Sequence, residues 1–259
     1  MISDHFTVTD PKNHVSWGCN PRDSGVFGKE CGDGDLDTME DLALDIIPRS
    51  EWIEEGVGMS ECVFHIFDQL DGMCASNAIT AGMMACLKQQ TGEEVFLAPE
   101  DLYDHVGRWG TGSTIPENVN AAANIGIRTR RQVAHDWPVK RPDGWQGDAA
   151  EHMLFEWADF SNHGWDGMVS LLHRDFCCFF GIIWPGGGAH AILATEYGNK
   201  LVRGPNSWGS DWGEDGFFKL SERQCKTLPR FGGVGIRAVT IPSYLPQPKL
   251  VASRGCPVS

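Results

Sequence analysis

The chain has 259 residues, which is enough to bury a full hydrophobic core as one domain with a small addition. Its hydrophobic content of 41% and charged content of 22% are ordinary for a soluble globular protein. The formal net charge of −14 argues against nucleic acid as a partner and against adsorption to an anionic membrane. No apolar stretch is long enough to cross a bilayer, so we expect no membrane insertion.

The N-terminus carries neither a basic head nor an apolar signal core, so we expect synthesis in the cytoplasm without a signal peptide. The nine cysteines are irregularly spaced and form no C-x-x-C pair, which predicts neither a zinc site nor a dense disulfide framework. Asp33, Asp35 and Asp37 alternate as calcium-loop carboxylates do. Thr38 and Leu44 stand where such a loop needs Gly and Glu, so we expect a solvated acidic turn there and no metal or cofactor.

Residues 1–47 differ from the rest of the chain, because their Gly- and Asp-rich stretch at 17–37 has little periodicity. We expect an extended arm that lies on the main domain, with an inhibitory, docking or structural role. The main domain is expected to span residues 48–242 and to be followed by a tail at 243–259.

The first half of the main domain is predicted to be mainly helical. One helix begins at Cys74, and small and apolar residues recur along it at helical spacing. Pro and Gly residues mark the limits of several others, and further helices are expected over 99–106, from Pro116 to Gly126, over 149–160 and over 166–174. Residues 127–147, which contain prolines and several arginines, are interpreted as an extended crossing on the surface.

The second half is predicted to consist mainly of antiparallel strands. A continuous apolar run at 176–184 indicates a strand buried on both faces. Shorter strands are expected over 190–197, 200–204, 216–220 and 235–241, with Gly-rich turns between them. Helices followed by strands indicate an α+β fold with two lobes, and not a parallel α/β sheet.

Cys74 is the first candidate for chemistry. A thiol in the first turn of a helix lies near unpaired N–H groups and the positive end of the helix dipole, which favour the thiolate. Taken alone, the pattern fits a buried inert cysteine better than a reactive one.

His190 and Asn206 form the second candidate. His190 begins a predicted strand and Asn206 follows the next one, so antiparallel pairing brings the two side chains together. An Asn carbonyl that accepts the imidazole N–H would fix the tautomer of the ring and leave its other nitrogen to face a thiol. Trp208 could shield that hydrogen bond from water. The structural alternative for the N-S-W-G stretch is a tight turn with a packed aromatic side chain.

With these motifs together, the chain resembles the papain-like cysteine peptidases over roughly residues 45–242. The matching motifs are D-Q-x-x-G-x-C-x-x-N-A at 68–78, G-A-H-A-I at 188–192 and N-S-W-G-x-x-W-G-E-D-G-F-F at 206–218. The resemblance implies a two-lobed fold with a helical N-terminal lobe and an antiparallel, β-barrel-like C-terminal lobe. It also implies a catalytic triad of Cys74 as nucleophile, His190 as base and then acid, and Asn206 as orienter.

The same resemblance implies the remaining site residues. Gln69 and the Cys74 backbone N–H would form the oxyanion hole, Gly112 and Ser113 would pair with the substrate backbone, and Trp208 would cover the histidine. The expected function is therefore a peptidase that cleaves peptide or protein substrates through an acyl-enzyme intermediate.

Several departures from the family pattern keep other functions open. The segment between Gln69 and Cys74 is one residue shorter than usual, the aromatic residue after the nucleophile is Ala75, and only P-G-G-G precedes the histidine strand. One alternative is a papain-fold structural component of a larger assembly such as a phage particle or tail, with weak or no turnover. Residues 1–47 would then bind the assembly partner. A second alternative is hydrolysis of peptidoglycan peptides.

Overall fold

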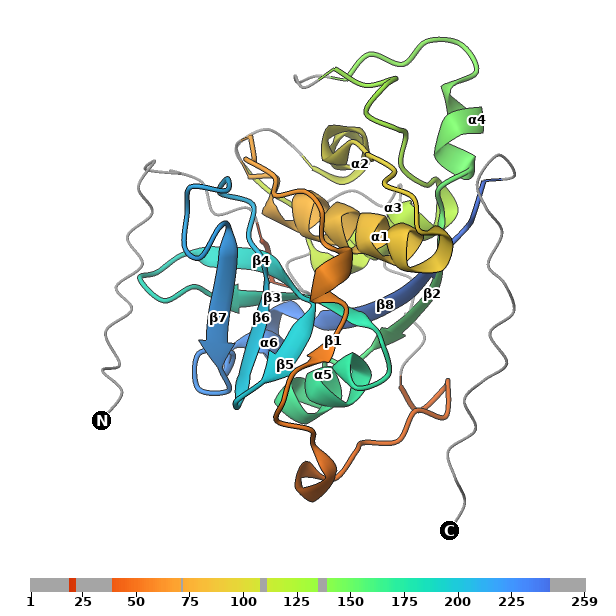
Figure 1. Cartoon of the computed structure of the whole chain (residues 1–259). Coiled ribbons are helices and arrows are strands. Elements are labelled where there is room, and N and C mark those ends of the chain that lie inside the picture. Colours follow the sequence, from red (N-terminus) through yellow and green to blue (C-terminus); the bar gives the residue numbers. More distant parts are fainter. Residues whose placement is uncertain (1–18, 22–38, 71, 108–110, 135–138, 243–259) are drawn as a thin grey trace.

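The computed structural model describes residues 19–21, 39–70, 72–107, 111–134 and 139–242 (Figure 1). The helices of these ranges are α1 (Cys74–Thr91), α2 (Pro99–Val106), α3 (Ile115–Asn124), α4 (Trp145–Ala150), α5 (Gly164–Leu172) and α6 (Leu228–Phe231), with short 3-10 turns at Arg49–Glu51 and Ser60–Cys62. The strands are β1 (Val57–Gly58), β2 (Leu154–Asp159), β3 (Cys177–Ile183), β4 (Ala189–Ala194), β5 (Glu196–Gly198), β6 (Leu201–Pro205), β7 (Phe217–Ser221) and β8 (Gly233–Val239).

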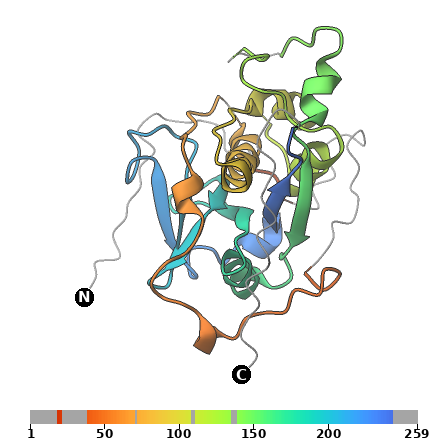
Figure 2. The same cartoon turned by 45° about the vertical axis from the view of Figure 1, so that its right-hand side comes forward.

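The strands form two open antiparallel sheets with the orders β2-β8-β3-β4 and β1-β5-β6-β7. The long helix α1 packs against β3, β4 and β8 of the first sheet, and α5 packs against the same sheet (Figures 1 and 2). Gly82 makes the close approach of α1 possible, because a Cβ there would lie 2.5 Å from the Ile236 side chain. The helices thus cover the sheet that carries His190.

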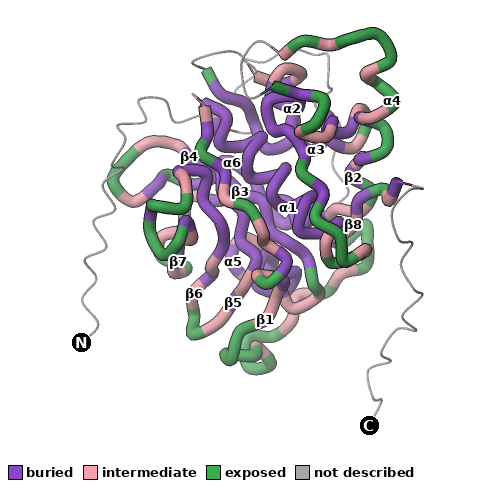
Figure 3. The backbone as a smooth tube through the Cα atoms, turned by 45° about the horizontal axis from the view of Figure 1, so that its top comes forward, coloured by how far each residue is buried: buried purple, intermediate pink, exposed green. Residues whose placement is uncertain are grey.

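Alternate residues of β3 enter different hydrophobic cores. Cys177 and Phe179 belong to the core around α1, whereas Cys178 and Phe180 belong to the core around α5. Every residue from Cys177 to Ile182 is buried, as the continuous apolar run predicts. Figure 3 shows this buried interior beneath the exposed loops and turns. The expected α+β architecture is therefore confirmed, with two open sheets in place of a closed barrel.

The two sheets are joined where β4 runs into β5. The backbone N–H of Thr195, at this corner, donates to Arg203 O of β6 at 2.9 Å. Across the junction, a Cβ at Gly204 would lie 1.8 Å from Leu193 O, so only glycine lets the backbones approach so closely. The corner places the end of β6, and with it Asn206, beside β4.

The predicted helix over 149–160 is wrong. Helix α4 ends at Ala150, and residues 154–159 form strand β2, which pairs antiparallel with β8. Leu154 and Trp157 have helical spacing, but pairing with β8 buries Leu154, Ala158 and Asp159 and leaves Phe155 74% exposed. The tertiary pairing outweighs the local pattern, as is usual for short apolar stretches.

The crossing predicted on the surface at 127–147 is also partly wrong. Arg128 has no exposed area and donates through Nε and Nη2 to Asp101 Oδ1, at 3.0 and 2.7 Å. The ion pair anchors this segment on α2 from inside the protein. The acidic turn at 33–37 and the tail at 243–259 lie outside the described residues.

Candidate functional site

Cys74 is the first residue of α1, and its side chain is fully buried. Its Sγ accepts a hydrogen bond from the backbone N–H of Ala191, on β4, at 3.4 Å. The positive end of α1 therefore meets β4 at the thiol, in the position that favours a thiolate. This contact places Cys74 beside the residue that follows His190, although the two lie far apart in the sequence.

His190 lies on β4, is 1% exposed and is hydrogen-bonded to Asn206. The Nε2 atom of the ring lies 2.8 Å from Asn206 Oδ1. Because an amide oxygen only accepts, Nε2 carries the proton in this pair, and Nδ1 is then the nitrogen whose lone pair can accept a proton. The same Oδ1 also accepts from the backbone N–H of Ser207 at 2.8 Å, which fixes the orientation of the amide.

Aromatic rings enclose the His190–Asn206 pair. Trp208 stacks on the imidazole with ring centroids 4.6 Å apart and an angle of 23° between the planes. Trp184 contacts the imidazole at 5.4 Å and 87°, and it also packs edge-on against Trp208. From the sequence, Trp184 is placed only at the end of the buried apolar run, and this contact is not predicted. Its place directly before the short P-G-G-G link to His190 was the available signal.

Gln69 lies in a segment that pairs with the Asn206 loop. Its backbone N–H donates to Ser207 O at 2.8 Å, and Asp68 forms an antiparallel bridge with Trp208. The Gln69 side chain is 5% exposed, and its Oε1 accepts from Ser207 Oγ at 2.5 Å. Ser207 therefore orients the Gln69 amide by binding its oxygen. The NH₂ group points the other way and is the part of the amide that could donate a hydrogen bond to an anion.

Gly112 and Ser113 lie at the edge of the helical lobe, directly before the capping box of α3. Gly112 has a φ of +72°, a conformation that favours glycine. Ser113 forms a parallel bridge with Cys19, and its carbonyl oxygen accepts from the Asn20 N–H at 2.9 Å. The backbone groups at 113 are thus used to pair with an extended segment of the same chain.

No group of three or more His, Cys, Asp or Glu side chains within the described ranges is arranged to hold a metal ion. No helix of these ranges is long and apolar enough to cross a membrane. The seven cysteines of the described part of the chain, Cys19, Cys62, Cys74, Cys86, Cys177, Cys178 and Cys225, are all free thiols and all buried.

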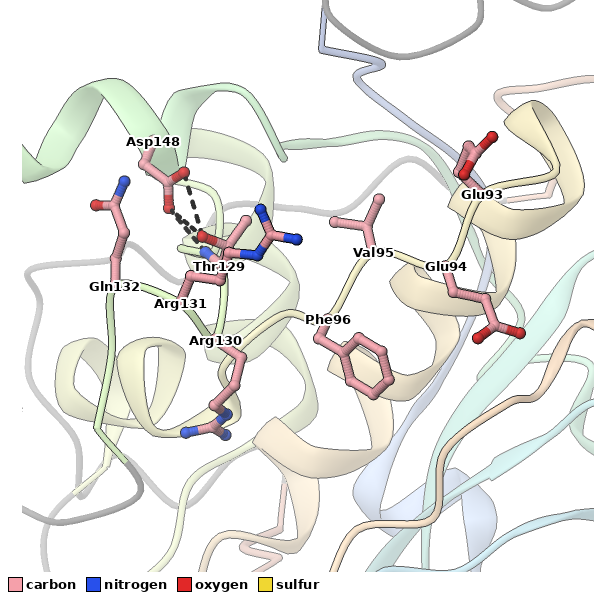
Figure 4. Close-up of a pocket in the computed structure, with 9 residues that line it drawn as sticks. All are labelled: Glu93, Glu94, Val95, Phe96, Thr129, Arg130, Arg131, Gln132 and Asp148. Atoms are coloured by element: carbon pink, nitrogen blue, oxygen red, sulfur yellow. Dashed lines mark hydrogen bonds between the residues drawn. The ribbon is translucent and has the colours of Figure 1, made fainter.

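A separate groove lies between the α1–α2 connection and residues 129–132 (Figure 4). It has a volume of about 570 Å³ and shares no residue with the Cys74 region. Several of its polar groups are engaged within the protein: Arg130 pairs with Glu100 at 2.5 Å, and Thr129 donates its N–H to Asp148 at 2.7 Å. We assign no function to this groove.

Comparisons with known proteins identify the fold. No protein-family model and no curated protein sequence matches the chain. Among solved structures, the cysteine protease xylellain from Xylella fastidiosa is similar with a TM-score of 0.64 and 17% identity, over 86% of this chain and 96% of that one. Procathepsin L 3 of the Tenebrio molitor larval midgut is similar with a TM-score of 0.60 and 15% identity, over 77% and 75%.

A third similar structure is the cysteine protease CMS1MS2 of Carica candamarcensis in complex with E-64. Its TM-score is 0.56 and its identity 17%, over 73% of this chain and all of that one. The chain therefore has the papain-like fold that its motifs predict. At these identities the likeness establishes the fold, and the chemistry has to be argued from the residues of this chain.

Proposed function

We propose that the protein is a cysteine peptidase in which Cys74, His190 and Asn206 form the catalytic triad. The observation that carries the proposal is that the His190 side chain and the Cys74 thiol both lie at the start of strand β4. The imidazole of His190 is held by Asn206 and Trp208, and the Cys74 thiol is hydrogen-bonded to the N–H of the next residue, Ala191. A buried, oriented imidazole beside a thiol at a helix start is the requirement for thiol activation.

The proposed reaction begins with transfer of the Cys74 proton to His190 Nδ1. The thiolate attacks the carbonyl carbon of the scissile peptide bond, and the negative charge passes to the carbonyl oxygen, where the Gln69 NH₂ group and the Cys74 N–H donate hydrogen bonds. The C–N bond then breaks, and His190 gives its proton to the leaving amine. Water, deprotonated by His190, hydrolyses the thioester and restores the Cys74 thiol.

The substrate would bind as an extended peptide along Gly112 and Ser113. Support comes from the pairing that Ser113 already makes with Cys19 and Asn20, because it demonstrates that an extended chain fits against this edge. Backbone pairing alone recognises peptides without regard to sequence, so side-chain preferences must arise from neighbouring pockets.

The test measures alkylation of each cysteine by iodoacetamide with peptide mass spectrometry. Cys74 is fully buried, and residues 19–21 occupy the edge at Ser113 where the substrate would bind. The assay therefore uses both the natural chain and Asn20→Ala, which removes the bond from Asn20 Nδ2 to Thr111 O. We expect labelling of Cys74 at least a hundredfold faster in Asn20→Ala than in Asn20→Ala/His190→Ala.

The matched control for the histidine change is His163→Ala, which removes a half-buried imidazole whose partner, Glu40, lies at the surface. This variant should label Cys74 at the unchanged rate. If Cys74 reacts no faster than glutathione in the same buffer, in both the natural chain and Asn20→Ala, the proposal is wrong.

A further inference from the structure

The short segment Cys19–Pro21 occupies the edge where the proposed substrate would bind (red trace in Figure 1). One backbone pairing and one side-chain contact hold it. The Cys19–Ser113 bridge includes the bond from the Asn20 N–H to Ser113 O at 2.9 Å, and Asn20 Nδ2 donates to Thr111 O at 2.8 Å. The segment lies there as an extended peptide, so its side chains show which pockets a bound peptide can reach.

The Cys19 side chain is 2% exposed and enters an apolar pocket. A Cβ built on Gly181 of β3 would lie 2.6 Å from Cys19 Sγ and 2.6 Å from Phe231 Cβ, so the absent side chain at 181 leaves just enough room for both neighbours. Within the described residues, the hydrogen bond recorded for the thiol is a long one, 4.0 Å to Asn20 O. The pocket therefore holds Cys19 by shape and apolar contact.

The pocket lies beside the proposed nucleophile. Gly181 is the register partner of Ala191, and the Ala191 N–H is bonded to Cys74 Sγ. Burial raises the pKa of the Cys19 thiol, and electrostatic repulsion from the nearby Cys74 side chain raises it further, which agrees with the two sulfur atoms lying close together. A peptide that replaced Cys19–Pro21 would place one side chain in this pocket with its backbone against Ser113, within reach of Cys74.

We propose that the Gly181–Phe231 pocket selects peptide substrates with a small uncharged side chain, such as that of Ala, Ser, Cys or Val, at the position now filled by Cys19. The inference rests on the proposed peptidase function. Phe231 and Cys19 pack against the same point of Gly181 in one buried core, so a Leu or Phe side chain at the place of Cys19 would have to displace Phe231. Overfilling of a packed pocket typically reduces specificity constants by tenfold or more.

The first experiment measures cleavage of a positional-scanning library of fluorogenic tetrapeptides by the full chain. We expect one position to be restricted to small residues, with Leu and Phe at least tenfold poorer. In Phe231→Ala the same position should accept Leu and Phe with a gain of at least tenfold, because the closing ring is gone. Phe176→Ala is the matched control, since it truncates a fully buried phenylalanine that packs against Gly235 and Arg237.

The resident segment competes equally with every peptide of the library, so it lowers all rates without changing their ratios. A profile without a small-residue position, or a profile that Phe231→Ala leaves unchanged, overturns the pocket assignment while the peptidase function stands. Absence of hydrolysis together with rapid, His190-dependent alkylation of Cys74 also overturns it. Absence of both refutes the proposed function and, with it, the pocket's role.

The second experiment tests whether the Cys19 side chain occupies this pocket, and it does not depend on peptide hydrolysis. In Gly181→Ala the new methyl group collides with Cys19 Sγ, so alkylation of Cys19 by a maleimide should accelerate at least tenfold. Gly147→Ala is the control, because a Cβ there meets no atom within 4 Å. Unchanged Cys19 reactivity in a folded Gly181→Ala protein would show that the thiol does not occupy this pocket.

Discussion

Replacement of Asn206 by alanine tests the most specific contact of the proposed triad. Asn206 Oδ1 accepts two hydrogen bonds at 2.8 Å, one from His190 Nε2 and one from the Ser207 N–H, and all three residues are buried. Alanine leaves both donors without this acceptor. Each buried donor left unsatisfied costs about 1–3 kcal/mol, so the variant should also be measurably less stable.

The effect on the reaction follows from the charged imidazole. His190 becomes an imidazolium when it takes the Cys74 proton, and a hydrogen bond to a charged group contributes about 1.5–3 kcal/mol. At about 1.4 kcal/mol per factor of ten, the loss corresponds to roughly a tenfold to hundredfold reduction in rate. Trp208 still stacks on the ring in Asn206→Ala, so the loss should be smaller than that of His190→Ala.

The assay is the second-order rate of Cys74 alkylation together with kcat/KM for a cleaved peptide, both in the Asn20→Ala background. Asn206→Asp keeps an acceptor oxygen at the same place and should recover most of the loss. Asn124→Ala, which removes an amide that donates to the Asn120 carbonyl near the end of α3, is the neutral control. An Asn206→Ala rate within twofold of the parent would refute the role of Asn206 as orienter.

Two further predictions concern stability. Asp101→Asn leaves the fully buried Arg128 guanidinium without its counter-ion and should lower the free energy of unfolding in urea by about 3–5 kcal/mol. Acidification should also destabilise the protein, because burial lowers the pKa of His152 below its ordinary value of 6.5. The unfolded state then binds more protons, so the stability that is full above about pH 6.5 is lost as the pH falls below it.

Each of these has a matched control. Glu94→Gln breaks the exposed Lys88–Glu94 pair and should cost less than about 1 kcal/mol, so an equal loss in Glu94→Gln and Asp101→Asn would contradict the reasoning. For the pH effect, unfolding in urea is compared at pH 7.5, 6.5 and 5.5 in the natural chain and in His152→Asn. The acid-dependent loss should be smaller in the variant, and identical slopes would exclude His152 as the cause.

The elements predicted best from the sequence are those whose ends are fixed by local chemistry. Pro99 and two acidic residues set the start of α2, and Thr114 with Glu117 forms the capping box that begins α3 at Ile115, one residue before the predicted start. The apolar run of β3 is predicted equally well, because burial on both faces requires no periodicity. Strand β2 was missed because its partner, β8, is remote in the sequence.

The same distinction applies to the candidate site. Asn206 and His190 were expected side by side, since a short hairpin joins their strands, and the structure brings them together. Trp184 was open to the same reasoning, because the short P-G-G-G turn between β3 and β4 returns the chain beside it, next to His190. Cys19 was not, because its position depends on pairing with Ser113, which no local pattern near residue 19 encodes.

The shortened segment before Cys74 raised the question of whether Gln69 reaches the oxyanion position. The structure gives a physical reason why one missing residue need not displace it: Gln69 is positioned by the Asn206 loop and not by the turn. Asp68 bridges to Trp208, the Gln69 N–H bonds Ser207 O, and the Phe67 carbonyl accepts from the Gly209 N–H at 2.9 Å. These contacts join the segment before the nucleophile to the loop that holds His190. A change at Ser207 should therefore disturb the proposed oxyanion donor and the proposed base together.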